Sequence, residues 1–293
     1  MDKRVKKNRF GFYEIINKPT QEELKSYYAE KYYQEASGGY EKYYSENEIL
    51  YFNNKLSQKY IVIKELLSDI SPKTFLDIGA GEGWTLDFFK KQAWHCTGLD
   101  YSEFGCKKHH PDCLADMQVG DIYENIVNLI AENKKYQVIL VDNVLEHVIE
   151  PFSLLKNIKQ LIDTNGILVI EVPNDFSITQ NYALEKGYIS QAFWVVYPDH
   201  LSYFNQEGLI NLCHEAGFQC ERTMGDYPID FNLINNNTNY IEDKTLGKSC
   251  HQIRVEIENL MHSISPEKTN QLYQVLGELG LGRQLIGFFK PKN

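Results

Sequence analysis

The sequence has no run of apolar residues long enough to cross a membrane, for which about 18 would be needed. It is also short of positive charge, because 30 lysines and arginines stand against 40 aspartates and glutamates, a formal net charge of -10. A broad basic face for nucleic acid or an anionic membrane is therefore not expected. Residues 1–9 carry five basic side chains but no apolar stretch of the signal-peptide kind, so a cytoplasmic protein with a small-molecule substrate is expected.

Cysteine is scarce and irregularly spaced. The six cysteines form no Cys-x-x-Cys pair and no zinc-ligand pattern, and a chain of 293 residues can build a core without disulfides, so free thiols are expected. His109 and His110 lie near Cys106 and Cys113. That spacing fits no common metal geometry and is typical of a polar turn around Pro111, so no metal site is predicted.

Residues 1–58 are polar and rich in tyrosine, with eight tyrosines between positions 27 and 51. Pro19 and Thr20, followed by two glutamates, are typical of a helix start. A segment this polar cannot form a core alone, so it is expected to pack as helices over another domain. Simple packing, a lid and an oligomer contact remain open as its role, and the protein is expected to be a monomer or a homodimer.

Between residues 59 and 224 short apolar strands alternate with amphipathic helices. Strands are predicted at 74–78, 96–99, 138–141 and 167–172, and helices at 59–70, 84–92 and 154–162. Near-continuous apolar strands separated by helices imply a parallel sheet covered on both faces. The predicted fold class is α/β, a doubly wound, Rossmann-like sheet.

Residues 225–293 are interpreted as a C-terminal extension that contacts substrate or a second subunit. A polar loop is expected at 235–239, helices at about 249–263 and 266–279, and a strand at 285–289. This last strand could add to an edge of the sheet.

The segment DIGAGEG, residues 77–83, lies between a predicted strand and a predicted helix, where an open parallel sheet binds its ligand. Gly79 and Gly81 allow a tight turn and a close approach of the ligand to the backbone. The GxGxG spacing differs by one residue from the GxGxxG fingerprint of dinucleotide sites. Asp77 and Glu82 place carboxylates beside the loop, which disfavours a pyrophosphate and favours a cationic ligand such as S-adenosylmethionine.

Two further aspartates follow the glycine loop. Asp100 ends the second predicted strand, where a carboxylate can accept hydrogen bonds from the two hydroxyls of a ribose. Tyr101 could lie against adenine, and Asp121 could take its amino group. Either aspartate alone is typical of a helix cap or turn, but both behind one glycine loop predict an adenosyl site.

These motifs resemble those of the class I S-adenosylmethionine-dependent methyltransferases. FLDIGAGEG is similar to their first motif, Asp100 to the acidic residue after their second strand, and Gly120 with Asp121 to their adenine-side motif. VILVDNVLEHVIEP and PDHLSYF are similar to segments of the subgroup that includes the ubiquinone-type O-methyltransferases. The resemblance covers about residues 59–224 and implies S-adenosyl-L-methionine as cofactor. The cofactor-binding residues in this interpretation are Asp77, Gly79, Ala80, Gly81, Trp84, Asp100, Tyr101, Asp121, Ile122, Asp142 and Asn143.

The flanking segments resemble methyltransferases of bacterial surface-polysaccharide gene clusters, such as those for capsule or lipopolysaccharide. The residues that carry this resemblance, besides the tyrosine-rich segment, are Asn239, Tyr240, Lys244, Gly247, Lys248, Arg254, Gly282 and Arg283. It implies a sugar, a nucleotide-sugar or another polysaccharide precursor as the methyl acceptor.

Methyl transfer is an in-line displacement, so the protein aligns the acceptor and removes a proton from a neutral hydroxyl. His147, just after the predicted strand at 138–141, is the expected base or acceptor-orienting group, because imidazole titrates near neutral pH. His200 is expected as a second catalytic or substrate residue. For both histidines a structural, hydrogen-bonded role is the alternative.

Three further residues are predicted to bind substrate. Tyr203 follows His200 in an aromatic segment, which could form either a substrate wall or a core under a long loop. Arg254 and Arg283 lie in sparsely basic surroundings and could hold a phosphate, since guanidinium is suited to bidentate phosphate binding. Ion pairs with the abundant glutamates are the alternative for both.

The residues therefore favour a methyltransferase for a small hydroxylated or phosphorylated acceptor. A nicotinamide-dependent oxidoreductase would need an intact GxGxxG, and a non-catalytic binding protein of this fold would be indicated by an eroded glycine loop. The acceptor atom, whether O, N or C, is left open.

Overall fold

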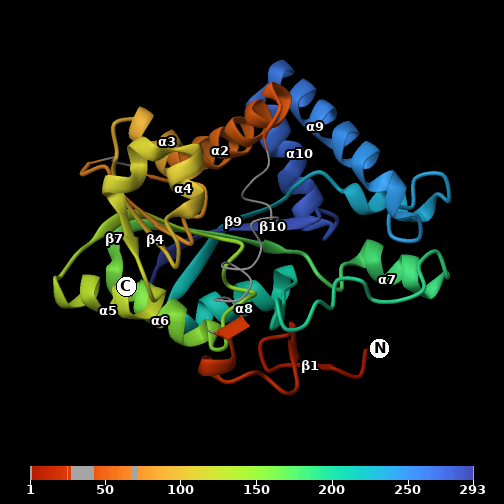
Figure 1. Ribbon diagram of the computed structural model, residues 1–293, viewed down its shortest axis with the longest axis horizontal. Coiled ribbons are helices and arrows are strands. Elements are labelled where there is room, and N and C mark those ends of the chain that lie inside the picture. Colours follow the sequence, from red (N-terminus) through yellow and green to blue (C-terminus); the bar gives the residue numbers. More distant parts are fainter. Residues whose placement is uncertain (1, 25, 28–42, 68–70, 293) are drawn as a thin grey trace.

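A seven-stranded sheet forms the centre of the protein in the computed structural model, which describes residues 2–24, 26–27, 43–67 and 71–292 (Figure 1). In spatial order its strands are β5 (Met117–Val119), β4 (His95–Asp100), β3 (Thr74–Ile78), β6 (Tyr136–Asp142), β7 (Ile162–Pro173), β10 (Gln284–Pro291) and β9 (Phe218–Gly225). The first five are parallel, and β10 is antiparallel to both of its neighbours. The Rossmann-like fold is confirmed, although the sheet is mixed rather than wholly parallel.

Strand β10 lies inside the sheet, so its expected place at an edge was wrong. Leu285 pairs with Val172 of β7 on one side and with Gly225 of β9 on the other. Residues 285–289 are all buried, as a strand covered on both faces requires. The expected boundary near residue 225 therefore does not coincide with a break in the sheet.

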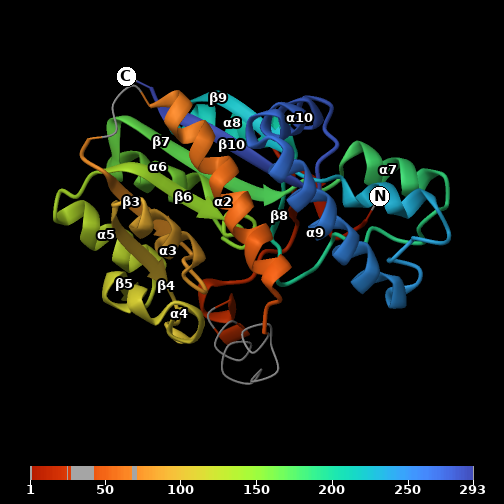
Figure 2. The same ribbon diagram turned by 90° about the horizontal axis from the view of Figure 1, so that it is seen from above.

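Helices cover both faces of the sheet (Figures 1 and 2). One layer contains α2 (Glu46–Leu66), α3 (Trp84–Lys91), α4 (Phe104–His109), α9 (Gly247–Ile264) and α10 (Pro266–Glu278), and the other contains α5 (Ile122–Ala131), α6 (Pro151–Leu161) and α8 (Gln206–Ala216). Alternate residues of β6 face opposite layers. Val138 and Leu140 pack in the core under the layer that contains α2, and Ile139 and Val141 pack in the core under the layer that contains α5.

Helix α2 begins 13 residues earlier than the pattern from residue 59 predicted. Ser45 and Glu48 form a capping box that starts it. Its first turns pack against α9, where Asn54 donates a hydrogen bond to Asn259 at 2.9 Å. The expected end of this helix at residues 68–70 lies outside the described residues.

The N-terminal segment begins with strands rather than helices. Strands β1 (Val5–Lys7) and β2 (Tyr13–Ile15) form a hairpin, and β2 pairs with β8 (Ser202–Tyr203). Four of its tyrosines, at positions 28, 32, 33 and 40, lie outside the described residues. The hairpin, α7 (Ile178–Glu185) and η3 (Ile229–Ile234) surround a third, smaller core that includes Trp194.

Two further short 3-10 helices are η2 (Pro111–Asp116) and η4 (Lys244–Leu246). All six cysteines are free thiols, as expected. Among the described residues, no helix combines the length and apolar character that a membrane crossing demands.

Candidate active site

The glycine loop joins β3 to α3 with three glycines in the left-handed region. The φ angles of Gly79, Gly81 and Gly83 are +85°, +51° and +80°. A Cβ atom on Gly79 would lie 2.3 Å from Cγ2 of Val144, so only glycine fits there. The amide of Gly79 donates to the carbonyl of Leu99 at 2.8 Å, which fixes the loop against β4.

Asp100 holds this loop from the end of β4. Its Oδ2 accepts a hydrogen bond from the amide of Gly81 at 2.8 Å, and its Oδ1 accepts one from the amide of Ser102 at 3.0 Å. A carboxylate oxygen can accept more than one hydrogen bond, so both oxygens retain capacity for the hydroxyls of a ribose. Burial raises the pKa of Asp100, and the backbone bonds oppose that rise.

Asp77 is a buried carboxyl group at the end of β3, with 2% of the residue exposed. Burial and the neighbouring Asp142 raise its pKa to about 8, while Lys59 opposes the rise. Asp77 is therefore largely protonated at neutral pH in the ligand-free protein. A cationic ligand beside it would favour the charged form.

Lys59 of α2 reaches between the ends of two neighbouring strands. Its Nζ lies 2.5 Å from Asp142 Oδ2 of β6 and 2.6 Å from Glu171 Oε2 of β7. Lys55, one turn earlier, lies 3.1 Å from Glu171. Burial alone would raise the pKa of Glu171, but the two lysines together lower it to about 2. Asp142 is thus paired within the protein, and Asn143 beside it is exposed with φ +51°.

These lysines were missed in the sequence, although one signal pointed to them. Glu171 is the only charged residue in the apolar stretch ILVIEV, and a buried carboxylate requires a cation. The partner could not be identified, because Lys55 and Lys59 lie more than a hundred residues away in the chain.

The structure pairs both arginines that were predicted to bind phosphate with carboxylates of the chain itself. The guanidinium of Arg254 contacts Asp226, and its Nε donates to Glu258 at 2.8 Å. Arg283 donates to Asp175 at 3.1 Å. Both arginines are therefore ion-paired, as in the alternative considered for them, although the pairs are buried rather than on the surface and include two aspartates. We leave both out of the proposed acceptor site.

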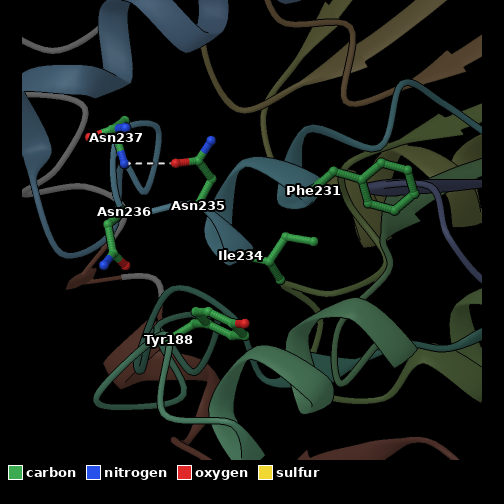
Figure 3. Close-up of a pocket in the computed structure, with 6 residues that line it drawn as sticks. All are labelled: Tyr188, Phe231, Ile234, Asn235, Asn236 and Asn237. Atoms are coloured by element: carbon green, nitrogen blue, oxygen red, sulfur yellow. Dashed lines mark hydrogen bonds between the residues drawn. The ribbon is translucent and has the colours of Figure 1, made fainter.

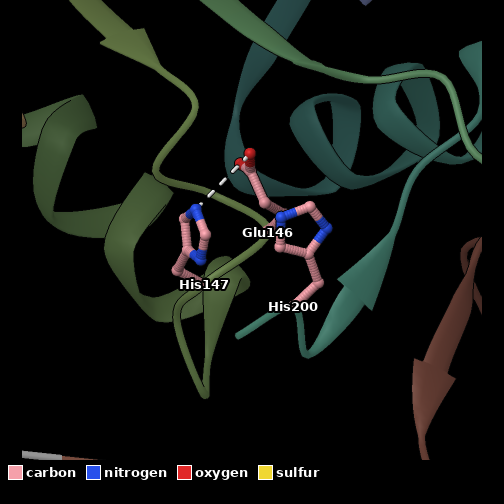
Figure 4. Close-up of side chains that lie close together, drawn as sticks. All are labelled: Glu146, His147 and His200. Carbon is pink, nitrogen blue, oxygen red and sulfur yellow. Dashed lines mark ion pairs between the residues drawn. The ribbon is translucent and has the colours of Figure 1, made fainter. Parts of the chain in front are cut away.

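Glu146, His147 and His200 come together where the loop after β6 meets the loop before β8 (Figure 4). The two imidazole rings are 4.9 Å apart between centroids and nearly perpendicular. His147 Nδ1 lies 2.7 Å from the backbone carbonyl oxygen of Asp199. Since a carbonyl only accepts, Nδ1 carries the proton, and in the neutral ring Nε2 presents a lone pair.

Glu146 is buried, with 1% of its side chain exposed. Its backbone carbonyl accepts hydrogen bonds from Leu201 at 2.8 Å and from Ser202 at 3.1 Å, which ties the two loops together. Burial raises the pKa of its carboxyl group well above the usual range, and Asp175 adds to the rise.

Tyr203 is fully buried, and its hydroxyl donates to the carbonyl of His200 at 2.9 Å. The structure therefore places its side chain in the core under the loop, one of the two alternatives considered for this segment. It supports the position of His200.

The other residues predicted to bind the cofactor, and Glu82 of the glycine loop, have mixed environments. Glu82 accepts hydrogen bonds from the hydroxyl of Tyr44 at 2.9 Å and from Trp84 Nε1 at 2.8 Å. Asp121 caps α5 by accepting from the amide of Tyr123 at 2.8 Å. Ala80 and Ile122 are buried, and Tyr101 is exposed.

The register of the sheet brings the predicted cofactor residues to one edge. Ile78 pairs with Leu99 on one side and with Val141 on the other, so Gly79, Asp100 and Asp142 follow directly at the same ends of three parallel strands. His147 follows five residues after Asp142.

A surface hollow of about 780 Å³ lies elsewhere, beside η3 (Figure 3). Its lining residues are Tyr188, Phe231, Ile234, Asn235, Asn236 and Asn237. None of them belongs to the glycine loop or to the histidine cluster, and we assign the hollow no role.

A glycine loop after the first strand of a Rossmann-like sheet, with carboxylates at the ends of the next strands, defines the class I S-adenosylmethionine-dependent methyltransferases. A family model described as a methyltransferase domain matches residues 52–223, and the chain belongs to that family. S-adenosyl-L-methionine is its cofactor, and the carboxylates and the glycine turn fit this ligand. The family favours this class over the nicotinamide-dependent alternative.

Two curated relatives are named ubiquinone biosynthesis O-methyltransferase. The protein of Pasteurella multocida is 25% identical over 185 residues, which cover 59% of this chain and 75% of the relative. That of Glaesserella parasuis is 24% identical over 195 residues, covering 61% and 81%.

The solved complex of the Haloferax volcanii Trm112 methyltransferase activator and a putative methyltransferase is similar in fold. It matches with a TM-score of 0.50 at 12% identity, covering 83% of this chain and 92% of that chain.

Proposed function

We propose that this methyltransferase transfers a methyl group to an oxygen of a small hydroxylated acceptor of the sugar or nucleotide-sugar class, as in surface-polysaccharide synthesis. The observation that carries the proposal is the lone pair of His147 Nε2, which the bond of Nδ1 to the carbonyl of Asp199 sets. His147 lies on the loop after β6, the neighbour of the strand that ends at Gly79. The names of the two relatives support oxygen as the acceptor atom, and the resemblance of the flanks supports the sugar class.

Bound S-adenosyl-L-methionine supplies an electrophilic methyl group. In the proposal, Asp100 accepts hydrogen bonds from the ribose, Gly79 and Gly81 let the ligand approach the backbone, and Asp77 offers negative charge to its cationic end. His147 orients the acceptor hydroxyl or takes its proton.

The test begins with calorimetric titration of the purified protein with S-adenosylmethionine, S-adenosylhomocysteine and, as a control, NAD. Methyl transfer from labelled cofactor is then measured to sugars and nucleotide-sugars, with catechols as a second acceptor class. We expect transfer to a sugar hydroxyl. Transfer to catechols alone would contradict the sugar class, and cofactor binding without transfer to any hydroxyl would favour a non-catalytic binding protein.

Asp100→Ala is expected to weaken cofactor binding by about 1.5–3 kcal/mol, the scale of hydrogen bonds to a charged group. The variant also loses the bond to the Gly81 amide, so its thermal unfolding is measured beside the titration. Asp112→Ala, at an exposed position of η2, is the matched control and should bind as the wild type does. Unchanged affinity in Asp100→Ala would remove this residue from the site.

Cofactor affinity is expected to rise with pH up to about pH 8. Asp77 has a pKa of about 8 in the free protein, and a bound cation would lower it, so binding below pH 8 releases a proton. The affinity should therefore increase by up to about tenfold per pH unit as the pH approaches 8 from below. Asp77→Asn should flatten this dependence in titrations across the range, and an equally steep profile in that variant would contradict the assignment.

A further inference from the structure

Three side chains with metal-binding atoms converge where the loops after β6 and before β8 meet. One ring nitrogen each of His147 and His200 and one carboxylate oxygen of Glu146 all lie within 4.8 Å of one another (Figure 4). We propose that these three residues bind one divalent transition-metal ion.

The spacing is close to that of a bound ion. With ligands at roughly 2.0–2.2 Å from a tetrahedral ion, neighbouring ligand atoms are about 3.3–3.6 Å apart. Glu146 Oε1 and His147 Nε2 are 3.7 Å apart already. The remaining spacings, at most 4.8 Å, need a contraction of no more than about 1.5 Å, which side-chain rotation can supply.

The hydrogen bonding of His147 prepares it as a ligand. Metal-bound histidines usually donate their other ring nitrogen to a carbonyl or carboxylate, which fixes the tautomer. His147 Nδ1 makes such a bond to the carbonyl of Asp199 at 2.7 Å. The lone pair of Nε2 then faces a carboxylate oxygen of Glu146, and a cation between these two acceptors would stabilise both.

The charges around Glu146 favour a cation as well. Its Oε2 is buried and has no hydrogen-bond partner among the described residues. A further carboxylate is close, because Asp199 Oδ1 lies 3.7 Å from His147 Nδ1. A buried carboxylate without compensation is costly, and a bound divalent ion would supply that compensation.

The donor set selects the kind of ion. Two imidazoles and one carboxylate suit Zn²⁺ and similar transition metals, whereas Mg²⁺ and Ca²⁺ prefer oxygen ligands. Three protein ligands leave a position open for an oxygen ligand. Under the proposed function, and only then, that ligand is the acceptor hydroxyl.

The sequence predicted no metal site because it was searched for local spacing. Glu146 and His147 are adjacent, but His200 stands 53 positions later, and only the fold brings it to them. The group of histidines and cysteines near Pro111, which was considered from the sequence, lies elsewhere in the chain; it consists of Cys106, His109, His110 and Cys113.

The test uses the full chain, treated with a chelator and then freed of it, without cofactor or acceptor. Calorimetric titration with Zn²⁺ should show one ion per chain, and titration with Mg²⁺ should show much weaker binding. The visible spectrum with Co²⁺ should show d–d bands of nitrogen and oxygen ligation without a thiolate charge-transfer band, which excludes binding to cysteines.

His200→Ala should weaken Zn²⁺ binding at least about tenfold, the lower end of what even outer ligands contribute. Glu146→Gln should also weaken Zn²⁺ binding at least about tenfold, provided that its circular dichroism spectrum matches that of the wild type. If a variant does not fold like the wild type, the Zn²⁺ affinity of His200→Asn is used to test the proposal instead. His214→Ala, exposed on α8, is the matched control and should bind as the wild type does.

The proposal is overturned by the lack of a stoichiometric ion in the wild type, by unchanged affinity in the His200 variants, or by a thiolate band with Co²⁺. Because the titrations contain neither cofactor nor acceptor, such a failure would leave the proposed methyl transfer untouched. Conversely, Zn²⁺ binding in a protein that methylates no hydroxyl would support the metal site alone.

Discussion

Replacing Lys59 by methionine is expected to lower the free energy of unfolding by about 3–5 kcal/mol, the cost of leaving a buried ion pair without one partner. The side chain of Lys59 is 7% exposed, and its Nζ lies 2.5 Å from Asp142 and 2.6 Å from Glu171. Methionine retains the apolar stem, so the loss reports the missing charge. Glu171, whose side chain is 2% exposed, would keep only Lys55, and Asp142, whose side chain is 27% exposed, would lose its contact with Lys59.

Denaturant unfolding near neutral pH measures the loss, and Lys64→Met on the exposed side of the same helix is the matched control. The control should stay within about 0.5 kcal/mol of the wild type. Adding Glu171→Gln to Lys59→Met should recover part of the loss, since it removes one of the two carboxylates that shared the missing cation. Equal stability of Lys59→Met and Lys64→Met would show that the network contributes nothing.

The ion pair of Lys59 with Glu171 also makes the stability of the wild type depend on pH. The folded-state pKa of Glu171 is about 2, below its ordinary value of 4.5. Its contribution to stability is therefore present above about pH 4.5 and is lost as the pH falls toward 2. Lys59→Met should show a smaller loss over this range, because one of the two cations that lower the pKa is gone.

His147→Ala is expected to lower turnover roughly 100-fold or more while cofactor affinity is retained. Nε2 of this imidazole can accept the proton of an acceptor hydroxyl, because Nδ1 carries the ring proton and donates it to the carbonyl of Asp199. The expected effect is the same whether the ring takes the proton itself or holds an ion that binds the hydroxyl. Alanine removes both possibilities.

Steady-state kinetics with a methylated acceptor, together with cofactor titration, separate the two parts of this prediction. His214→Ala should retain normal turnover, since that histidine is exposed on α8. Normal turnover in His147→Ala would exclude the ring from acceptor activation. A parallel loss of cofactor affinity and stability would instead indicate a structural role in joining the two loops.

Much of the parallel sheet could be predicted because its signals are local. The strand at 74–78 was predicted with its bounds as observed, since a short, mostly apolar or β-branched stretch ends directly at a glycine turn. Asp100 was recognised because its distance from Gly79 is set by one helix and one strand. In both cases, neighbouring residues in the chain are neighbours in space.

The remainder depended on partners far away in the chain. Arg254 could be a phosphate ligand or half of an ion pair, and only the position of Asp226 decides where its guanidinium points. The placement of β10 likewise depends on which of two strand edges is open. The cluster of Glu146 and His200 requires two loops to meet, and no spacing pattern encodes that.

Because β10 lies between β7 and β9, the sheet can be completed only after β10 has been synthesised. Residues 284–291 leave the ribosome after the other six strands of the sheet, so β7 and β9 each keep an open edge until then. Open strand edges of a nascent chain pair readily with other chains. The two edges therefore stay unpaired while residues 226–283 are synthesised, which leaves the emerging chain open to pairing with other chains over that interval.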